Sequence, residues 1–226
     1  MIVYIIKIIL CTAFFYSVYK LLFENEKMHQ FNRFYLLFSV IFSLIVPFVV
    51  IGSITHIQSP NIESIVYTPI KSTPKLIPAI HSSEEHIVNY STLIFAVYLF
   101  ITLLILIHFV RNLYKIYKRK NGSPVLTYCG FKIITLQERI TPHSFLNFIF
   151  LSHDDYHAGV IEKEILQHEL THVKQKHSYD ILFIEFLIAL FWFNPFLYLY
   201  RKSIKLNHEY LADDAVINIY HQPIKY

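Results

Sequence analysis

The chain has 226 residues, of which 54% are hydrophobic and 16% charged, and its formal net charge is +4. With a mean hydropathy of +0.42, this composition excludes an ordinary soluble domain and predicts a membrane protein. The two cysteines, Cys11 and Cys129, exclude a disulfide framework. The cations lie beside apolar segments and form no basic stripe, so we expect no direct binding of nucleic acid.

Three apolar runs, at residues 1–23, 34–52 and 92–110, each approach the length of about 20 residues that a helix needs to cross a bilayer. The segment between the second and third runs, residues 53–90, contains four prolines and is typical of an extended loop. We therefore expect residues 1–110 to form a transmembrane region of three helices, with 53–90 as an external loop.

The distribution of lysine and arginine predicts the orientation of these helices. Five cations crowd the exit of the third run with no acid among them: Arg111, Lys115, Lys118, Arg119 and Lys120. The positive-inside rule places that end in the cytoplasm. Alternation then puts the N-terminus outside and residues 111–226 inside.

Short strand-like runs follow the third span, at residues 131–134 and 145–151, separated by Thr141-Pro142-His143. They predict a small sheet, so the cytoplasmic segment is expected to be an α+β domain. An exposed edge strand of this sheet could hold an extended peptide by main-chain hydrogen bonds. Ordinary half-buried sheet with no role in substrate binding is the alternative.

The most informative motif is His168-Glu169-Leu170-Thr171-His172, on a helix expected to begin near Val160 and to run past His172. Residues i and i+4 share a helical face, so both imidazoles can reach one tetrahedral zinc ion. Glu169 then faces the metal-bound water as a general base. The motif predicts the first half of a zinc-peptidase site.

A third ligand has to come from elsewhere in the chain. The metzincin pattern would require glycine at position 175 and histidine at 178, which are Gln175 and Ser178, and we interpret His177 as a surface histidine. Glu209-Tyr210-Leu211-Ala212-Asp213 resembles the E-x-x-x-D element of glutamate-type zincins. Glu209 can ligate the metal, while Asp213, one turn later, can hydrogen-bond a ligand histidine and fix its orientation.

The apolar run at residues 181–200 has to be reconciled with this site. If it crossed the membrane, Glu209 would emerge on the side opposite His168, and no shared zinc site could form. Asn194-Pro195 supplies an N-cap and a first-turn proline, so we expect a broken helical hairpin, re-entrant or interfacial. Glu185 within it is either a functional acid or a residue that faces the protein interior or the lipid headgroups.

With His168 to His172, Trp192-Phe193-Asn194-Pro195 and the Asn207 to Asp213 element in place, the chain resembles the BlaR/MecR-type membrane metallopeptidases. The resemblance implies a zinc endopeptidase of the bacterial cytoplasmic membrane, with its active site facing the cytosol. The best-known members cleave a transcriptional repressor when an external domain detects a beta-lactam. Such a penicillin-binding domain follows the zincin core in those sensors and is absent from residues 1–226, so we do not expect this chain to sense beta-lactams.

Carried over residue by residue, the resemblance implies His168, His172 and Glu209 as Zn²⁺ ligands, Glu169 as general base and Asp213 as the residue that orients a ligand. We expect cleavage of a protein substrate, such as a cytosolic repressor, under the control of a sensor partner or of a second copy of the chain. Two other functions stay open: a non-catalytic transducer with a structural zinc site, and a quality-control protease of the HtpX type. Tyr179, Tyr210 and the histidines from His143 to His157 are candidates by residue type for stabilising the oxyanion.

Overall fold

The computed structural model describes residues 2–48, 90–121, 123–128, 130–159 and 161–220. The chain begins with α1 (Ile2–Val18), which continues as a π-helical turn, η1 (Tyr19–Phe23). After a short turn come α2 (His29–Ile45) and a single 3₁₀ turn, η2 (Val46–Phe48). The predicted external loop falls almost wholly outside the described residues, which resume at α3 (Tyr90–Asn121).

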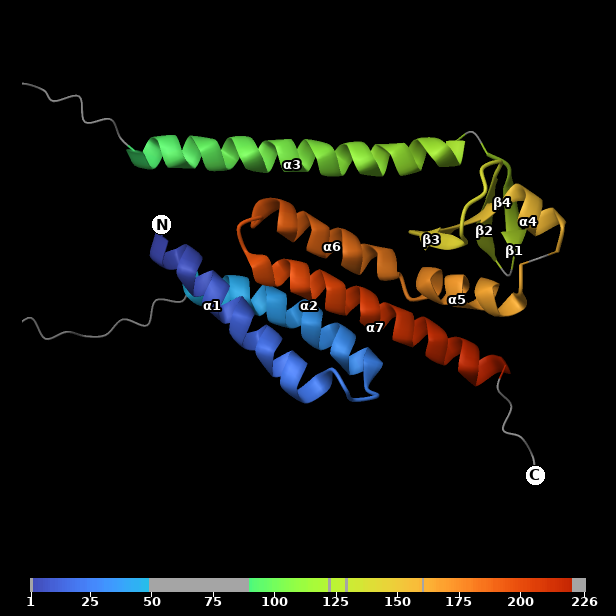
Figure 1. The fold of residues 1–226 in the computed structure, drawn as a ribbon, viewed down its shortest axis with the longest axis horizontal. Coiled ribbons are helices and arrows are strands. Elements are labelled where there is room, and N and C mark those ends of the chain that lie inside the picture. The colour runs from blue at the N-terminus through green and yellow to red at the C-terminus, as the bar shows by residue number, and fades with distance from the viewer. Residues whose placement is uncertain (1, 49–89, 122, 129, 160, 221–226) are drawn as a thin grey trace, which may run out of the picture.

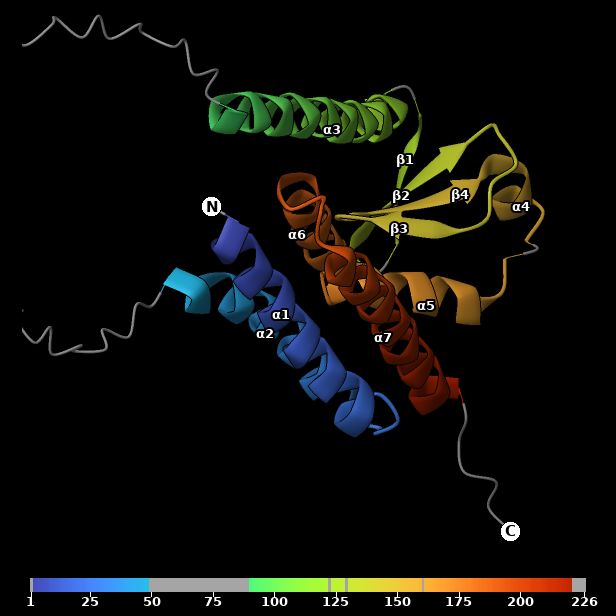
Figure 2. The same cartoon turned by 60° about the vertical axis from the view of Figure 1, so that its left-hand side comes forward.

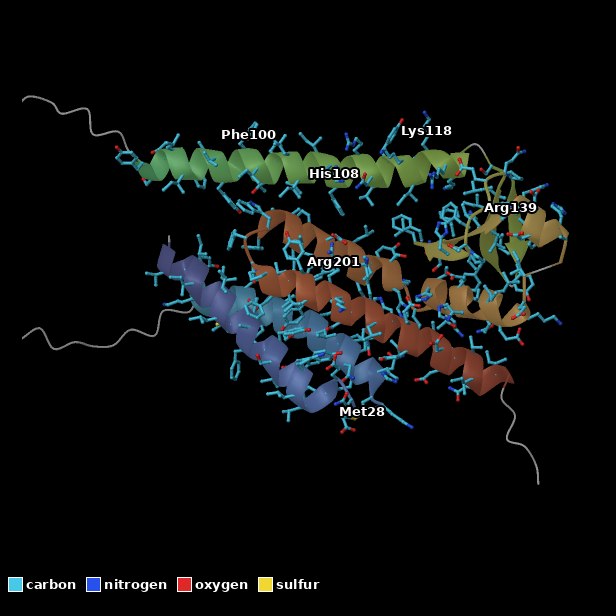
Figure 3. The ribbon with its side chains drawn as sticks, viewed as in Figure 1. Met28, Phe100, His108, Lys118, Arg139 and Arg201 are labelled. Atoms are coloured by element: carbon cyan, nitrogen blue, oxygen red, sulfur yellow. The ribbon has the colours of Figure 1, made fainter. Side chains whose placement is uncertain are left out.

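Two of the described helices, Val3–Phe23 and Tyr90–Lys120, are long and apolar enough to cross a membrane. Only 6% of the apolar window of α3 is buried, and Phe100 on its outer face is 62% exposed (Figure 3). An apolar helix that is so little covered by protein is compatible with a membrane protein. α2, which covers part of the second apolar run, has only 17 described residues and is not among these two helices, so the span over residues 34–52 stays a prediction.

The third apolar run extends further as a helix than its hydropathy indicated. α3 has 32 residues, or about 48 Å at 1.5 Å per residue, which exceeds the roughly 30 Å of a hydrocarbon core. Its last turn reaches the sheet, where the Lys120 ammonium lies 4.4 Å from the Phe148 ring centroid. Figure 1 shows α3 beside α6, with the sheet at its end.

The predicted small sheet is present and has four strands: β1 (Val125–Tyr128), β2 (Phe131–Leu136), β3 (His143–Phe145) and β4 (Phe148–Ser152). Their order is β1-β2-β4-β3; β2 and β4 are parallel and the other pairs are antiparallel. The prediction of one strand over 145–151 was wrong. Leu146 has a positive φ of 51° and turns the chain, so β3 and β4 form a hairpin and β3 becomes an edge strand.

Four helices follow the sheet: α4 (His153–His157), α5 (Lys163–Lys174), α6 (His177–Leu190) and α7 (Pro195–Tyr220). The apolar run over 181–200 is broken at the predicted place, because α6 ends at Leu190 and α7 begins at Pro195. Asn194 caps the new helix, accepting a hydrogen bond from the Phe196 N–H at 3.1 Å. The two helices form a hairpin that returns the end of α7 to α5 (Figures 1 and 2).

Glu185 on α6 accepts hydrogen bonds from Arg201 Nη1 on both carboxylate oxygens, each at 3.1 Å. Arg201 lies between the two helices of the hairpin (Figure 3). This ion pair supports the interpretation of Glu185 as an interior-facing residue.

Separate clusters of buried apolar side chains hold the helices and the sheet in place. One joins α1, α2, α6 and α7, and its fully buried members include Leu36, Leu197 and Tyr200. Another lies between the sheet and α5, around Ile149 and Val173. As a result, α5 is held by the sheet and α7 is held by α1, α2 and α6.

Candidate metal centre

Two histidines on α5 and one glutamate on α7 direct their donor atoms at one point. His168 Nε2 lies 3.1 Å from His172 Nε2. Glu209 Oε2 lies 3.2 Å from His168 Nε2 and 3.8 Å from His172 Nε2. The donor atoms of these three side chains all lie within 4.8 Å of one another, and among the described residues this is the group of His, Cys, Asp and Glu side chains that could hold a metal ion. The structure therefore brings together the three predicted metal ligands.

The spacing of these atoms fits a tetrahedral zinc ion. Zinc binds histidine nitrogen and carboxylate oxygen at about 2.0–2.1 Å. Tetrahedral angles then place neighbouring ligand atoms about 3.4 Å apart, and the three observed separations of 3.1, 3.2 and 3.8 Å lie around that value. Three protein donors also leave a fourth position free, as in a catalytic site.

The outer nitrogens of both histidines have partners. Asp213 Oδ1 lies 3.0 Å from His168 Nδ1, which is the kind of contact expected of it. His172 Nδ1 lies 2.8 Å from His177 Nδ1. Protons on both ligand Nδ1 atoms satisfy these contacts. Both Nε2 lone pairs then point at the Glu209 carboxylate, an arrangement that a cation would stabilise.

The prediction that His177 lies on the surface was wrong. Its side chain is 2% exposed, and burial is the main cause that lowers its pKa. The reason is the backbone at Lys176, which is left-handed with φ of 58°. This residue ends the turn after α5 and lets α6 start with His177 facing back toward His172. Sequence motifs for metal sites identify the ligands themselves. They do not identify His177, which contacts the proposed ligand His172 but is not one of the three donors.

Glu169 is separate from the three donors and lies in the same cavity. Its side chain is 8% exposed. Burial raises the pKa of Glu169 above its ordinary value, and a hydrogen bond with Ser144 acts in the opposite direction. A carboxylate whose pKa is raised toward neutrality is better matched to taking and returning a proton.

The cavity around these residues has a volume of about 400 Å³. Edge strand β3 and Pro142 before it form one wall, α5 forms the floor, and the start of α6 and part of α7 complete it. Of the residues predicted as candidates for stabilising the oxyanion, His143 lines the cavity. Tyr210 instead packs against His29, with the two ring centroids 5.1 Å apart. Lys205, one turn before Glu209, also lines it and was not anticipated.

Comparison with known families supports the same part of the chain. Residues 145–226 match the family described as BlaR1 peptidase M56. The matched segment contains β4, α5, the α6–α7 hairpin and all three converging donors. A search of curated proteins found no match.

Proposed function

Because residues 145–226 match the family described as BlaR1 peptidase M56, we propose that the chain is a membrane zinc endopeptidase that cleaves a protein substrate on the cytoplasmic side, in signalling or in control of gene expression. The observation that carries this proposal is the convergence of His168 Nε2, His172 Nε2 and Glu209 Oε2 at separations that suit zinc. The match to a peptidase family suggests the reaction, and the donor set suggests the metal.

The proposed roles follow from where each side chain lies. Bound Zn²⁺ would supply a Lewis acid that polarises a water molecule and the scissile carbonyl. Glu169 would take the proton of the attacking water and return it to the leaving amine, since it shares the cavity without belonging to the donor group. Asp213 and His177 would hold the two ligand imidazoles in orientation and tautomer.

The proposed substrate is an extended segment of protein bound along β3. β3 lies at the edge of the sheet, so one side of its backbone pairs with no other strand among the described residues. The strand also forms a wall of the cavity that holds Glu169. A peptide pairing with that side would pass the donor group with its main chain fixed by hydrogen bonds. Alternate side chains would then project toward the cavity and away from it.

The proposed topology places α1, α2 and α3 across the membrane, with the N-terminus outside and residues 111–226 in the cytoplasm. The last turn of α3 carries Lys118, Arg119 and Lys120, at the end of the helix that reaches the sheet (Figure 1). The positive-inside rule assigns that end to the cytoplasm. The candidate metal centre would lie on the same side, because α6 and α7 form a hairpin and the end of α7 returns to α5.

The test compares wild type, Glu169→Gln and His168→Ala in mild detergent and in cells. Bound zinc should be about one ion per chain in wild type and Glu169→Gln and strongly reduced in His168→Ala, because only the last variant lacks a proposed ligand. Cleaved cytosolic proteins should be found in wild-type cells and be missing from Glu169→Gln cells, with a loss of about 10²–10⁴-fold in rate expected for a general base.

The outcomes separate this proposal from the two other functions. Wild type without zinc would refute the metal centre. Zinc retained in Glu169→Gln together with an unchanged signalling phenotype would indicate a structural metal in a transducer. Trapping of many misfolded membrane proteins by Glu169→Gln, in place of one regulator, would indicate quality control.

A further inference from the structure

Arg33 on α2 contacts both segments that flank the turn after the metal-binding helix. Its Nε donates a hydrogen bond to Asp180 Oδ2 at 2.6 Å, and its Nη2 donates one to the Gln175 carbonyl at 2.9 Å. The side chains of Arg33 and Asp180 are each 12% exposed. Two acceptors at fixed angles suit the planar guanidinium fork, which a lysine ammonium cannot reproduce.

One of the two acceptor residues, Gln175, leads to the proposed ligand His172. The side-chain Oε1 of Gln175 accepts a hydrogen bond from His177 Nε2 at 3.1 Å. With that proton on Nε2, His177 Nδ1 carries a lone pair and accepts a hydrogen bond from the His172 Nδ1–H at 2.8 Å. The tautomers of both imidazoles are therefore set by Gln175, whose backbone is held by Arg33.

The second acceptor leads toward Glu209. Asp180 Oδ2 accepts a hydrogen bond from His208 Nε2 at 3.0 Å, and His208 is the residue before Glu209. The His208 ring lies flat on that of His177, with centroids 3.9 Å apart and planes 2° from parallel. Burial alone would raise the pKa of Asp180, but the hydrogen bonds from His208 and Arg33 outweigh it and hold that pKa below its ordinary value.

Other contacts place the start of α2 against the same region. Gln30 Nε2 donates to Gln175 Oε1 at 3.4 Å, and Asn207 Nδ2 on α7 donates to the His29 carbonyl at 2.8 Å. The beginning of α2 thus touches Gln175, the residue that follows α5, together with α6 and α7. A shift of α2 would alter several of these contacts together.

We propose that Arg33 is a positioning residue through which the α1–α2 hairpin controls the geometry of the metal centre. The inference rests on the proposed function, because it assigns a role toward the zinc ligands. Arg33 holds the ends of two partly buried series of hydrogen bonds, one that leads to His172 and one that leads to His208, the residue before Glu209. Displacement of the hairpin relative to α6 would release both paths and loosen metal binding.

The chain offers a matched control in a second arginine–carboxylate pair on α6. Arg201 binds Glu185 with both distances at 3.1 Å, and within the described part of the chain no hydrogen bond or ion pair links these two residues to the donor group or its partners. Arg33→Gln and Arg201→Gln each remove a guanidinium that pairs with a carboxylate of α6, so if both arginines were only structural, the two variants should affect zinc binding equally. Arg33→Lys keeps the charge and loses the fork.

The experiment uses the full chain in detergent, with zinc affinity measured by competition with a chelator and site geometry by the absorption spectrum of the cobalt-substituted protein. Arg33→Gln should weaken zinc binding about tenfold, the lower end of the effect of outer partners of metal ligands, and should change the cobalt spectrum. Arg33→Lys should be intermediate in both. Arg201→Gln should match wild type in both, even where its thermal midpoint is lower.

Wild-type zinc affinity and cobalt spectrum in Arg33→Gln would overturn the inference, and so would an equal loss of affinity in Arg201→Gln. If Arg33→Gln does not fold, Arg33→Lys carries the test, and wild-type values for it would overturn the inference. A wild-type protein that binds no zinc would refute the proposed function and this inference with it. Zinc bound equally by wild type and Arg33→Gln would refute the inference alone.

Discussion

Zinc should raise the thermal stability of this protein, because it would join α5 and α7 through donors that otherwise face one another with unshared lone pairs 3.1 to 3.8 Å apart. A ligand that binds only the folded state stabilises it by RT ln(1 + [L]/Kd), or about 2.7 kcal/mol at a free concentration of 100 Kd. For a chain of this length each kcal/mol shifts the midpoint by about 2–4 °C. The expected rise is therefore about 5–10 °C.

Glu209→Gln removes the anionic donor while keeping the shape of the side chain. Loss of one of three protein ligands should reduce affinity by at least about 100-fold, the upper end of the effect of outer partners. At the same free zinc the site would be about half occupied, and the stabilisation would fall to about 0.4 kcal/mol, or roughly 1–2 °C. Glu185→Gln is the control, since Glu185 pairs with Arg201 and not with the donors.

The assay follows tyrosine and tryptophan fluorescence during heating in detergent, with free zinc set by a metal buffer and with excess chelator as the zero point. Glu185→Gln should unfold at a lower temperature than wild type but show the full zinc-dependent rise. A rise of the same size in Glu209→Gln and wild type would refute the assignment of Glu209 as a ligand. No rise in wild type would refute the metal centre.

Three further changes test individual contacts. Asp213→Ala should lower zinc affinity about tenfold, near the lower end of the range for outer partners, because the Asp213 side chain is 61% exposed; unchanged affinity in chelator competition would mean that His168 keeps its orientation unaided. Lys176→Val should destabilise by about 1–2 kcal/mol, since a β-branched residue is poorly suited to the left-handed backbone there, and Lys176→Gly should unfold close to wild type in the same thermal assay. Asn194→Ala should cost about 1–2 kcal/mol through loss of the cap on the Phe196 N–H; Asn194→Ser, which keeps an acceptor, should recover most of that stability, and equal losses in the two variants would argue against the cap.

The parts of the fold that could be predicted are those with a local chemical signal. Asn194-Pro195 predicted the break in the apolar run, because a cap and a first-turn proline act within one turn of helix. The ligand pair on α5 followed from helical spacing alone. The helix itself begins at Lys163 and not near Val160, since apolar periodicity marks a helical face more reliably than a helix end.

The parts that could not be predicted depend on contacts between distant residues or on a single backbone torsion. The turn between β3 and β4 is Leu146-Asn147, and a single asparagine beside a leucine with a positive φ is a weak turn signal within an apolar run. The β3–β4 hairpin was therefore missed, and with it the edge strand beside the cavity. His177 could not be placed without the left-handed Lys176. Arg33 lies 147 residues before its partner Asp180, and no local sequence pattern links two residues that far apart.

The arrangement of α7 has a consequence for how the site would respond to motion. This one helix carries both Glu209 and Asp213, so the third donor and the partner of His168 are fixed to the same rigid rod one turn apart. A rotation or slide of α7 that withdraws one carboxylate withdraws the other as well, and His168 would lose its neighbour on both nitrogens at once. A displacement of α7 should therefore weaken metal binding more than the loss of either carboxylate alone.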